Sequence, residues 1–320
     1  MAEYQSTNMA DLIADVASHI KDEVRTSGKL PSVRKVSTEP LVNPALFPFI
    51  TVTPVNEVPQ GYRGNKLYML RRIRIEMVSK KNDSKSSLRQ TMGMAEQVKE
   101  IFKVNATDYK VPDRATKATD TVMDLEIVSI ETSSNPAPFR NGFIHTSAIE
   151  LEAHSFDKIY TLDNPPTTSR ALTAAATDTK TVVDKFTSFI KAARVGSPLL
   201  PEIRSLKSFT LPPQPVYPVV FVSIEDESRD HRFAGQDSVN RTVGVNVFTK
   251  VKSRQKSLDR NVDLADRLRQ IIMAYPDVDG TCYQMDYAGT NFGQITAGAD
   301  LLFGTQVLFT TSSYESLPTS

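Results

Sequence analysis

The chain has 320 residues, of which 40% are hydrophobic and 23% charged, as is typical of globular proteins. No stretch approaches the roughly 20 consecutive apolar residues of a membrane span, which argues against a membrane protein. Thirty-eight basic and thirty-seven acidic side chains give a net charge of +1, which argues against a general nucleic-acid-binding surface.

The N-terminal segment and the cysteine content bear on the cellular compartment. The first residues lack the basic segment and the continuous apolar core of a signal peptide. Cys282 is the single cysteine, so no internal disulfide can form. We therefore expect the protein to fold in a reducing cytoplasm.

The chain repeats itself with an offset of 170 residues. Residues 1–102 align with residues 171–272 without a gap, and 18 of these 102 positions are identical. About six identities are expected by chance from ordinary composition. Hydrophobic character is kept more widely than identity, because burial and volume constrain a core more than residue type does. The sequence therefore predicts two copies of one domain, with copy one at 1–157, a polar linker at 158–178 and copy two at 179–320.

Each copy begins with an amphipathic helix, predicted at residues 9–25 and 179–194 because apolar side chains recur there at helical spacing. A segment interrupted by prolines follows at 28–46 and 196–216. Since proline lacks the backbone donor that a helix or a central strand uses, this segment is predicted to be an arm or a long loop.

Two strands come next in each copy. A short apolar strand is predicted at residues 47–54 and 217–225. It is followed by a strand whose apolar side chains alternate with a period of two, as at Ile73 and Val243. We expect each pair to form a hairpin.

The second helix has one apolar stripe in each copy, which predicts that it packs on the sheet. The stripe consists of Leu88, Met92, Ala95, Val98 and Phe102 in copy one and of Leu258, Val262, Ala265, Leu268 and Ile272 in copy two.

Copy one has about twelve extra residues within 103–122. When these are left out of the alignment, the last two strands of the two copies correspond. Side-chain parity aligns Ile149 with Val307, an offset of 158, because a slip of one residue would turn apolar side chains to the wrong face. Each copy thus reads helix–strand–strand–helix–strand–strand. The predicted fold class is α+β, with an antiparallel sheet covered by helices in each copy.

No pattern of catalytic or metal-binding residues stands out. The chain has no glycine-rich phosphate loop, no Cys-x-x-Cys pair and no His-x-x-x-His pair. His145 and His154 have opposite parity on one strand and should face opposite sides of the sheet, while His19 and His231 lie on other elements. Cys282 is predicted to be a small buried side chain. We therefore expect no catalytic residue, no metal and no cofactor.

Three connections are candidates for interaction with partners, and each also fits a solvated turn. Connections at 55–66 and 225–238 join the first two strands of the copies, and a proline-rich connection lies at 132–142. Arg71, Arg72 and Arg74 could contact phosphate, but the alternating Ile residues around them are interpreted instead as a strand with one solvated face. The candidate interaction residues are Tyr62, Arg63, Phe139, Arg140, Arg229, Asp230, Arg232 and Phe233.

The order and lengths of these elements resemble the tail terminator proteins of tailed bacteriophages. The resemblance rests on the N-terminal helix, the proline-bearing arm, the hairpin FPFITVTP…YMLRRIRIEMVSK, the helix SLRQTMGMAEQVKEIF and the long strand FIHTSAIELEAHSF. It implies a virion protein, assembled in the host cytoplasm, that forms a ring at the head-proximal end of the tail tube. Such a ring ends tube polymerisation and joins the tail to the neck, without catalytic residues.

The duplication departs from the familiar members of this family, which have one such domain in each chain. We expect a homo-hexamer, with a trimer of duplicated chains as the alternative. The implied partners are the tail tube protein, a neck or connector protein and, in a contractile tail, the sheath protein, with no membrane or specific nucleic acid. Alternative functions are a sheath-capping, collar or other head–tail connector protein, or a small-ligand-binding protein or enzyme with a site between the domains.

Overall fold

The computed structural model describes most of the chain and divides it into two compact units, Met1–Lys158 and Ile159–Ser320. Each unit is described by itself. The predicted linker lies almost entirely outside the described residues, as do the extra residues that follow the second helix of unit 1. The described residues are 8–28, 30–38, 46–63, 66–104, 124–133, 137–138, 142–157, 178–196, 200, 202–210, 215–232, 236–250, 254–274, 282, 284–297 and 300–316.

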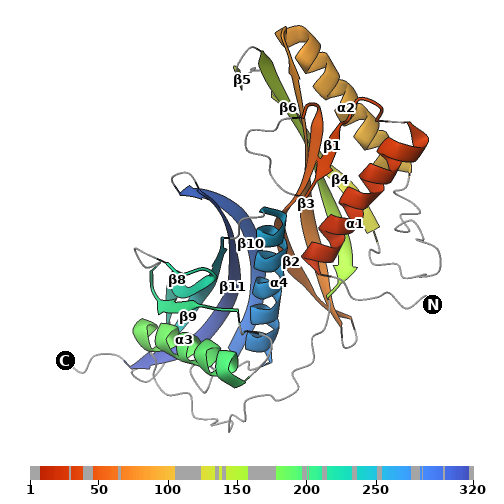
Figure 1. Ribbon diagram of the computed structural model, residues 1–320. Helices are drawn as coiled ribbons and strands as arrows, with labels where there is room; N and C mark the ends of the chain where they lie inside the picture. Colours follow the sequence, from red (N-terminus) through yellow and green to blue (C-terminus); the bar gives the residue numbers. More distant parts are fainter. Residues whose placement is uncertain are drawn as a thin grey trace. The chain divides into compact units, whose positions relative to one another are not determined.

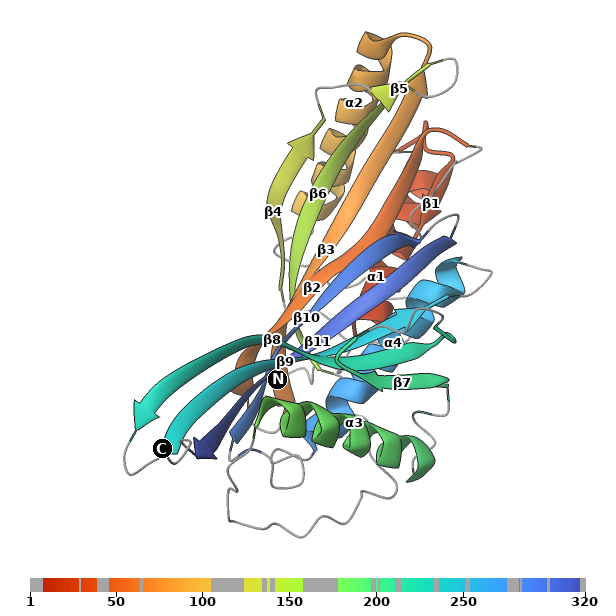
Figure 2. The same ribbon diagram turned by 90° about the vertical axis from the view of Figure 1, so that its left-hand side faces the viewer.

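Unit 1 is a mixed sheet with two helices (Figure 1). Its helical elements are α1 (Met9–Asp22), the π-helical turn η1 (Glu23–Ser27) and α2 (Ser84–Val104). Its strands are β1 (Lys35–Ser37), β2 (Phe49–Arg63), β3 (Lys66–Lys81), β4 (Asp124–Thr132), β5 (Ala137–Pro138) and β6 (Phe143–Phe156). The strand order is β4-β6-β3-β2, and Figure 2 shows these strands side by side.

The two helices of unit 1 cover the same face of its sheet. The Asn8 side chain caps α1 by accepting a 2.8 Å hydrogen bond from the backbone N–H of Asp11. Apolar residues of α1 such as Leu12 and Val16 are fully buried. The rings of His19 in α1 and Phe102 in α2 meet edge to face at 5.8 Å, which places the helices next to each other.

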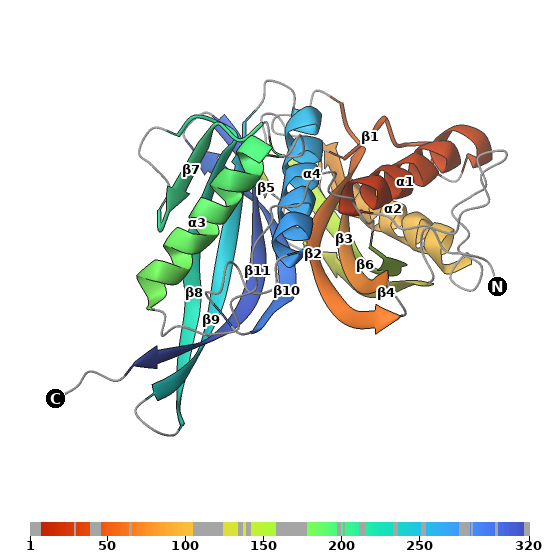
Figure 3. The ribbon, with the colours of Figure 1, turned by 90° about the horizontal axis from the view of Figure 1, so that it is seen from below.

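Unit 2 is also a mixed sheet with two helices on one face (Figure 3). Its helices are α3 (Thr179–Gly196) and α4 (Arg254–Met273). Its strands are β7 (Ser205–Ser208), β8 (Val219–Arg232), β9 (Gln236–Thr249), β10 (Gln284–Ala297) and β11 (Asp300–Ser316), in the order β10-β11-β9-β8-β7. Phe186 of α3 packs on Phe309 of β11 with ring centroids 6.2 Å apart. No described helix of the protein is both long and apolar enough to cross a membrane.

The expectation of purely antiparallel sheets is wrong. The segments predicted to be arms each contain a short strand, and β1 and β7 pair in parallel with β2 and β8. Each is held at its start by a 2.9 Å backbone bond, from Arg34 N–H to the Pro48 carbonyl and from Arg204 N–H to the Pro218 carbonyl. A strand of three or four residues is too short to show the period-two alternation of a strand. The surrounding prolines therefore led to the prediction of an arm or a loop.

The hairpins are also longer than predicted, since β2 and β8 run through most of the predicted connections at 55–66 and 225–238. A β-bulge between Pro54 and Asn56 lies where the apolar pattern of β2 ends, and one between Ile224 and Asp226 lies at the same point of β8. A bulge adds a residue to one strand only, so it breaks the period-two pattern while the hydrogen-bond ladder continues.

Two helix details differ from the prediction. The α-helix α1 ends at Asp22, and a π-helical turn continues to Ser27 before Gly28, whose φ of 66° suits a glycine at a helix end. In α2, Met92 of the predicted stripe is 50% exposed, and Met94 is buried in its place. The four other residues of that stripe lie on the covered side, and the predicted stripe of α4 is buried throughout.

Candidate functional site

The structure does not gather the predicted interaction residues into one site. Tyr62 and Arg63 are the last two residues of β2, and Arg229, Asp230 and Arg232 lie near the end of β8. These residues are therefore in strands and not in the predicted loops, because β2 and β8 continue beyond their bulges. Arg229 and Asp230 are exposed, and Arg229 forms a 2.9 Å ion pair with Glu227 of its own strand. Phe139, Arg140 and Phe233 lie outside the described residues.

The histidines have separate structural surroundings. His145 is 1% exposed and lies on the face of the sheet that α2 covers. A 2.6 Å hydrogen bond joins Nδ1 of His154 to the Tyr68 hydroxyl. The register pairs His145 with Ser79 and His154 with Leu70, so the prediction that the two face opposite sides of the sheet is confirmed. The side chain of His231 lies outside the described residues.

Cys282 is a buried free thiol, as predicted. Across the ranges that the structure describes, His, Cys, Asp and Glu side chains form no group of three that could hold a metal ion. The described part of the chain therefore offers no set of residues to which a metal could be assigned.

Ion pairs cover the face of the unit 1 sheet that points away from the helices. Arg72 pairs with Glu152 at 3.0 Å, and Arg74 pairs with Glu150 at 3.1 Å. Both arginines are more than a third exposed, as expected for a solvated strand face. Arg71 is different, because it points to the helix-covered face and is fully buried.

The buried Arg71 side chain connects three strands of unit 1. Its guanidinium donates to the Glu57 carboxylate at 3.1 Å and to the Asp157 carboxylate at 3.0 Å, and it also donates to the Ser155 hydroxyl. Both carboxylates are nearly buried, with side-chain exposures of 4% and 6%. One positive charge thus lies between two negative ones, and the cluster ties β2, β6 and the residue that follows β6 to β3.

Unit 2 has a buried arginine of the same kind. The fully buried Arg241 side chain donates to the Glu227 carboxylate at 3.0 Å and to the Ser313 hydroxyl at 2.5 Å. Thr179, the first residue of α3, donates a 2.5 Å hydrogen bond to the same carboxylate. This bond, followed by those from Arg229 and Arg241, lowers the pKa of Glu227 from 4.5 to about 2, against the opposing effect of burial.

The lowered pKa of Glu227 predicts an acid-sensitive contribution to folding. Because its folded pKa lies below the ordinary value of 4.5, the contribution is present above pH 4.5 and is lost as the pH falls toward 2. We expect Glu227→Gln to remove this part of the pH dependence, measured as the urea midpoint between pH 5 and pH 2. Asp226→Asn, at the exposed neighbouring position, is the control and should leave the dependence unchanged. Parallel curves for the wild type and Glu227→Gln would contradict the assignment.

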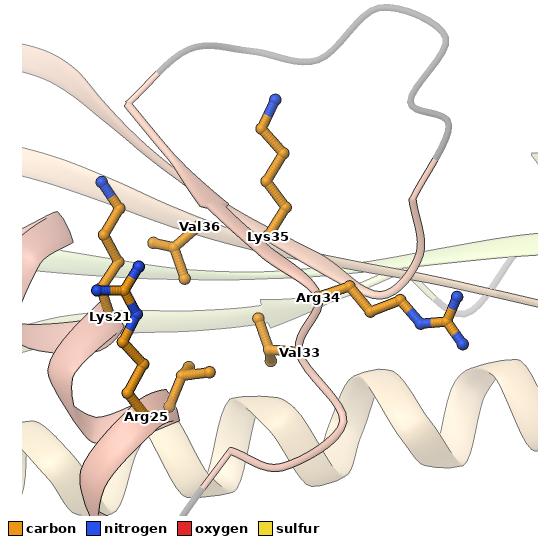
Figure 4. Close-up of a pocket in the computed structure, with 7 residues that line it drawn as sticks. Lys21, Arg25, Val33, Arg34, Lys35 and Val36 are labelled. Carbon is orange, nitrogen blue, oxygen red and sulfur yellow. The ribbon is translucent and has the colours of Figure 1, made fainter.

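A basic groove lies between the end of the first helix and the short parallel strand of unit 1. We call it groove 1; Figure 4 shows its side chains, and its volume is about 240 Å³. The helix contributes Lys21, and the π-helical turn contributes Arg25. Two further cations come from β1 and the residue before it. The seven lining residues are Lys21, Val24, Arg25, Val33, Arg34, Lys35 and Val36.

Groove 1 carries positive charge that the described part of the protein does not neutralise. None of the described residues that line it is acidic. Within the described ranges, the side chains of Lys21, Arg25, Arg34 and Lys35 form no hydrogen bond or ion pair. Cations at a helix C-terminus are favoured by the helix dipole, which accounts for Lys21 and Arg25. The dipole gives no reason for Arg34 and Lys35, which come from another segment.

A second groove, groove 2, lies at the corresponding place in unit 2, between α3 and β7, with a volume of about 490 Å³. It is also basic, but part of its charge is used within the unit. Asp184 lines the groove and forms a 3.4 Å ion pair with Lys180, and Arg194 donates a 3.3 Å hydrogen bond to the Ile203 carbonyl. The basic side chains of groove 2 are Lys191, Arg194, Arg204 and Lys207.

Comparisons with known proteins do not assign the chain to a family. No protein-family model matches it, and no curated protein matches it either. A solved structure, that of the di-domain ARO/CYC StfQ from the steffimycin biosynthetic pathway, aligns at 7% identity over 96% of this chain and 82% of that chain. Its TM-score of 0.10 is too low to carry any argument about fold or function.

The two grooves were not predicted from sequence, because their residues come from a helix end and from a segment predicted to be a loop. One signal could have found them. Lys21 and Arg34 recur as Lys191 and Arg204 at the offset of 170 residues, and all four line a groove.

Proposed function

We propose that the two units are diverged copies of one domain. The support is the order of their elements, because helix, short parallel strand, hairpin, helix and long antiparallel pair follow one another in both. The bulge between Ile224 and Asp226 lies 170 residues after the one between Pro54 and Asn56. Bulges tend to be kept within a family, so their matching positions favour a common origin.

The strand registers support the same relationship. Ile75 of β3 lies opposite Ile149 of β6, and Val245 of β9 lies opposite Val307 of β11. These pairs agree with offsets of 170 and 158 for the two strands. A second pair of bulges, at Ile127 and Tyr287, agrees with an offset of 160 for β4 and β10. Superposition of the units in an experimental structure tests the duplication, and different registers there would contradict it.

We further propose that the protein is a structural component of a tailed-bacteriophage virion and not an enzyme. It would form a ring at the head-proximal end of the tail tube, end tube polymerisation and connect the tail to the neck. The observation that carries this proposal is that both units have the element order for which the sequence resembles tail terminators. Two related scaffolds with different surfaces on one chain suit a protein that contacts itself and a second partner.

The surfaces that differ between the units favour six chains over three. The described lining of groove 1 contains no acidic residue, whereas that of groove 2 contains Asp184. If three chains formed a pseudo-sixfold ring, the two units would occupy equivalent positions and would benefit from equivalent surfaces. A ring of six chains leaves one unit of each chain for another protein, such as the neck, connector or sheath protein.

The mass of the purified full-length protein tests the ring. Native mass spectrometry and negative-stain images are expected to reveal closed rings of six 35.5 kDa chains. Rings of three chains would support the alternative stoichiometry, and a monomer at every concentration would contradict ring formation.

A polymerisation assay tests the role in assembly. Addition of the protein to polymerising tail tube protein is expected to stop elongation and to leave shorter tubes with a ring at one end. Unchanged tube lengths together with binding to the sheath protein would instead indicate a sheath-capping protein.

A further inference from the structure

We propose that groove 1 is a docking site for an extended acidic peptide segment of a partner protein. That the partner is another protein of the same assembly rests on the proposed function, whereas the acidic character of the segment follows from the groove itself.

The four cations of groove 1 repel one another without compensation from the described part of the chain. Lys21 and Arg25 come from the helical segment, and Arg34 and Lys35 come from the strand segment. Since none of the described residues that line the groove carries a carboxylate, an anionic partner would supply the missing opposite charge. Charge complementarity therefore identifies the chemistry of the ligand.

The directions of these side chains favour an extended ligand over a small anion. Figure 4 shows Arg34 and Lys35 extending in different directions from the strand segment, while Lys21 and Arg25 extend from the helix. The four charged groups thus do not converge on one point, as a phosphate or sulfate site would require. Several carboxylates along one segment could meet them separately.

The apolar residues of groove 1 favour a peptide over a nucleic acid. Val24, Val33 and Val36 lie among the cations, and the side chains of Val24 and Val36 are partly exposed. Apolar side chains of a peptide can pack on such valines, whereas single-stranded nucleic acids use aromatic rings for stacking. The overall charge of +1 also gives no excess of positive charge for a nucleic-acid backbone.

The two units keep groove charges where most positions have diverged. Five charged residues are identical at the offset of 170: Lys21, Arg34, Glu57, Arg71 and Lys80. Glu57 and Arg71 form the buried ion pair described above, which explains their retention by folding. Lys21 and Arg34 have no such structural partner in the described ranges, and both line the groove. Binding explains why these two charges are kept.

Groove 2 is a matched reference within the same chain. Its lining includes the Asp184 carboxylate, which pairs with Lys180 at 3.4 Å and accepts a 3.2 Å hydrogen bond from the Ser208 hydroxyl. Because this acid reduces the positive charge available to a ligand, groove 1 is expected to bind an acidic segment more tightly.

The test measures binding of a fluorescein-labelled hexaglutamate peptide to the full chain by fluorescence anisotropy. Lys21→Glu/Arg34→Glu changes groove 1, and Lys191→Glu/Arg204→Glu makes the same changes in groove 2. We expect the first variant to weaken binding about tenfold, which corresponds to about 1.4 kcal/mol, and the second to weaken it less than about threefold. Binding by the wild type should also weaken with added salt, because the charges are exposed. Circular dichroism checks that both variants fold.

Several outcomes would overturn the proposal. These are the absence of peptide binding, an equal loss in both variants, or tighter binding of a single-stranded oligonucleotide of the same charge. Loss of self-association in Lys21→Glu/Arg34→Glu alone would identify a second copy of the chain, and not another protein, as the occupant. The ring measurement distinguishes the proposed ring from the proposed docking site. A wild-type chain that forms rings but does not bind the peptide would contradict the docking site alone.

Discussion

Replacement of Arg71 by methionine is expected to lower the free energy of unfolding by about 3–5 kcal/mol. The side chain is fully buried and compensates the Glu57 and Asp157 carboxylates, which lie at 3.1 and 3.0 Å. Methionine keeps much of the volume but leaves two buried carboxylates without their cation. The cost is therefore the burial of uncompensated charge rather than a loss of packing.

The neighbouring residue provides a matched control for this experiment. Arg72 pairs with Glu152 at 3.0 Å, but its side chain is 41% exposed. Arg72→Met should cost no more than about 1 kcal/mol, because solvent screens an exposed pair. Urea unfolding of the full chain measures both values. Equal costs for the two substitutions would contradict the compensating role of Arg71.

The second large effect is expected in the core of unit 2. Phe309→Ala should cost about 3–5 kcal/mol, because it removes a fully buried ring and leaves a cavity. The ring lies 6.2 Å from that of Phe186 in α3 and 6.0 Å from that of Tyr287 in β10. Its loss removes a ring contact between α3 and β11 and another between β10 and β11.

Phe248 of β9 is the matched control for Phe309. Its ring stacks on Phe221 at 5.8 Å, but the residue is only half-buried. Phe248→Ala should therefore cost about 1–2 kcal/mol, from one aromatic pair and a partial loss of burial. Thermal and urea unfolding measure the difference. A cost for Phe309→Ala as small as that of Phe248→Ala would mean that the cavity is filled by movement of α3.

Long periodic elements were predictable from sequence, whereas short or interrupted ones were not. The buried residues of α4, including Val262 and Leu268, recur at a spacing that places them all on one side of a helix. The strands β1 and β7 have no such pattern, because their pairing depends on backbone bonds to distant residues. The strands β2 and β8 were predicted too short because each contains a bulge. The bulged residue shifts the alternation of side chains, while the strand pairing continues beyond it.

The candidate site was less predictable than the fold. Aromatic and charged residues near predicted turns, such as Tyr62 and Arg229, were predicted to be interaction residues because loops often carry binding residues. The structure places them in strands, and it brings Lys21 and Arg34 together from segments that the sequence separates by a turn. The burial of Arg71 was not predicted, because its acidic partners, Glu57 and Asp157, lie elsewhere in the sequence.

By itself the sequence determined the α+β class and the apolar faces of the long helices, since these follow from local spacing. Only the tertiary structure decided which charges are compensated. Arg71 and Arg72 are adjacent in sequence, yet one is fully buried between carboxylates and the other is exposed. Successive residues of a strand point to opposite faces, and the partners that give each arginine its role come from strands elsewhere in the chain.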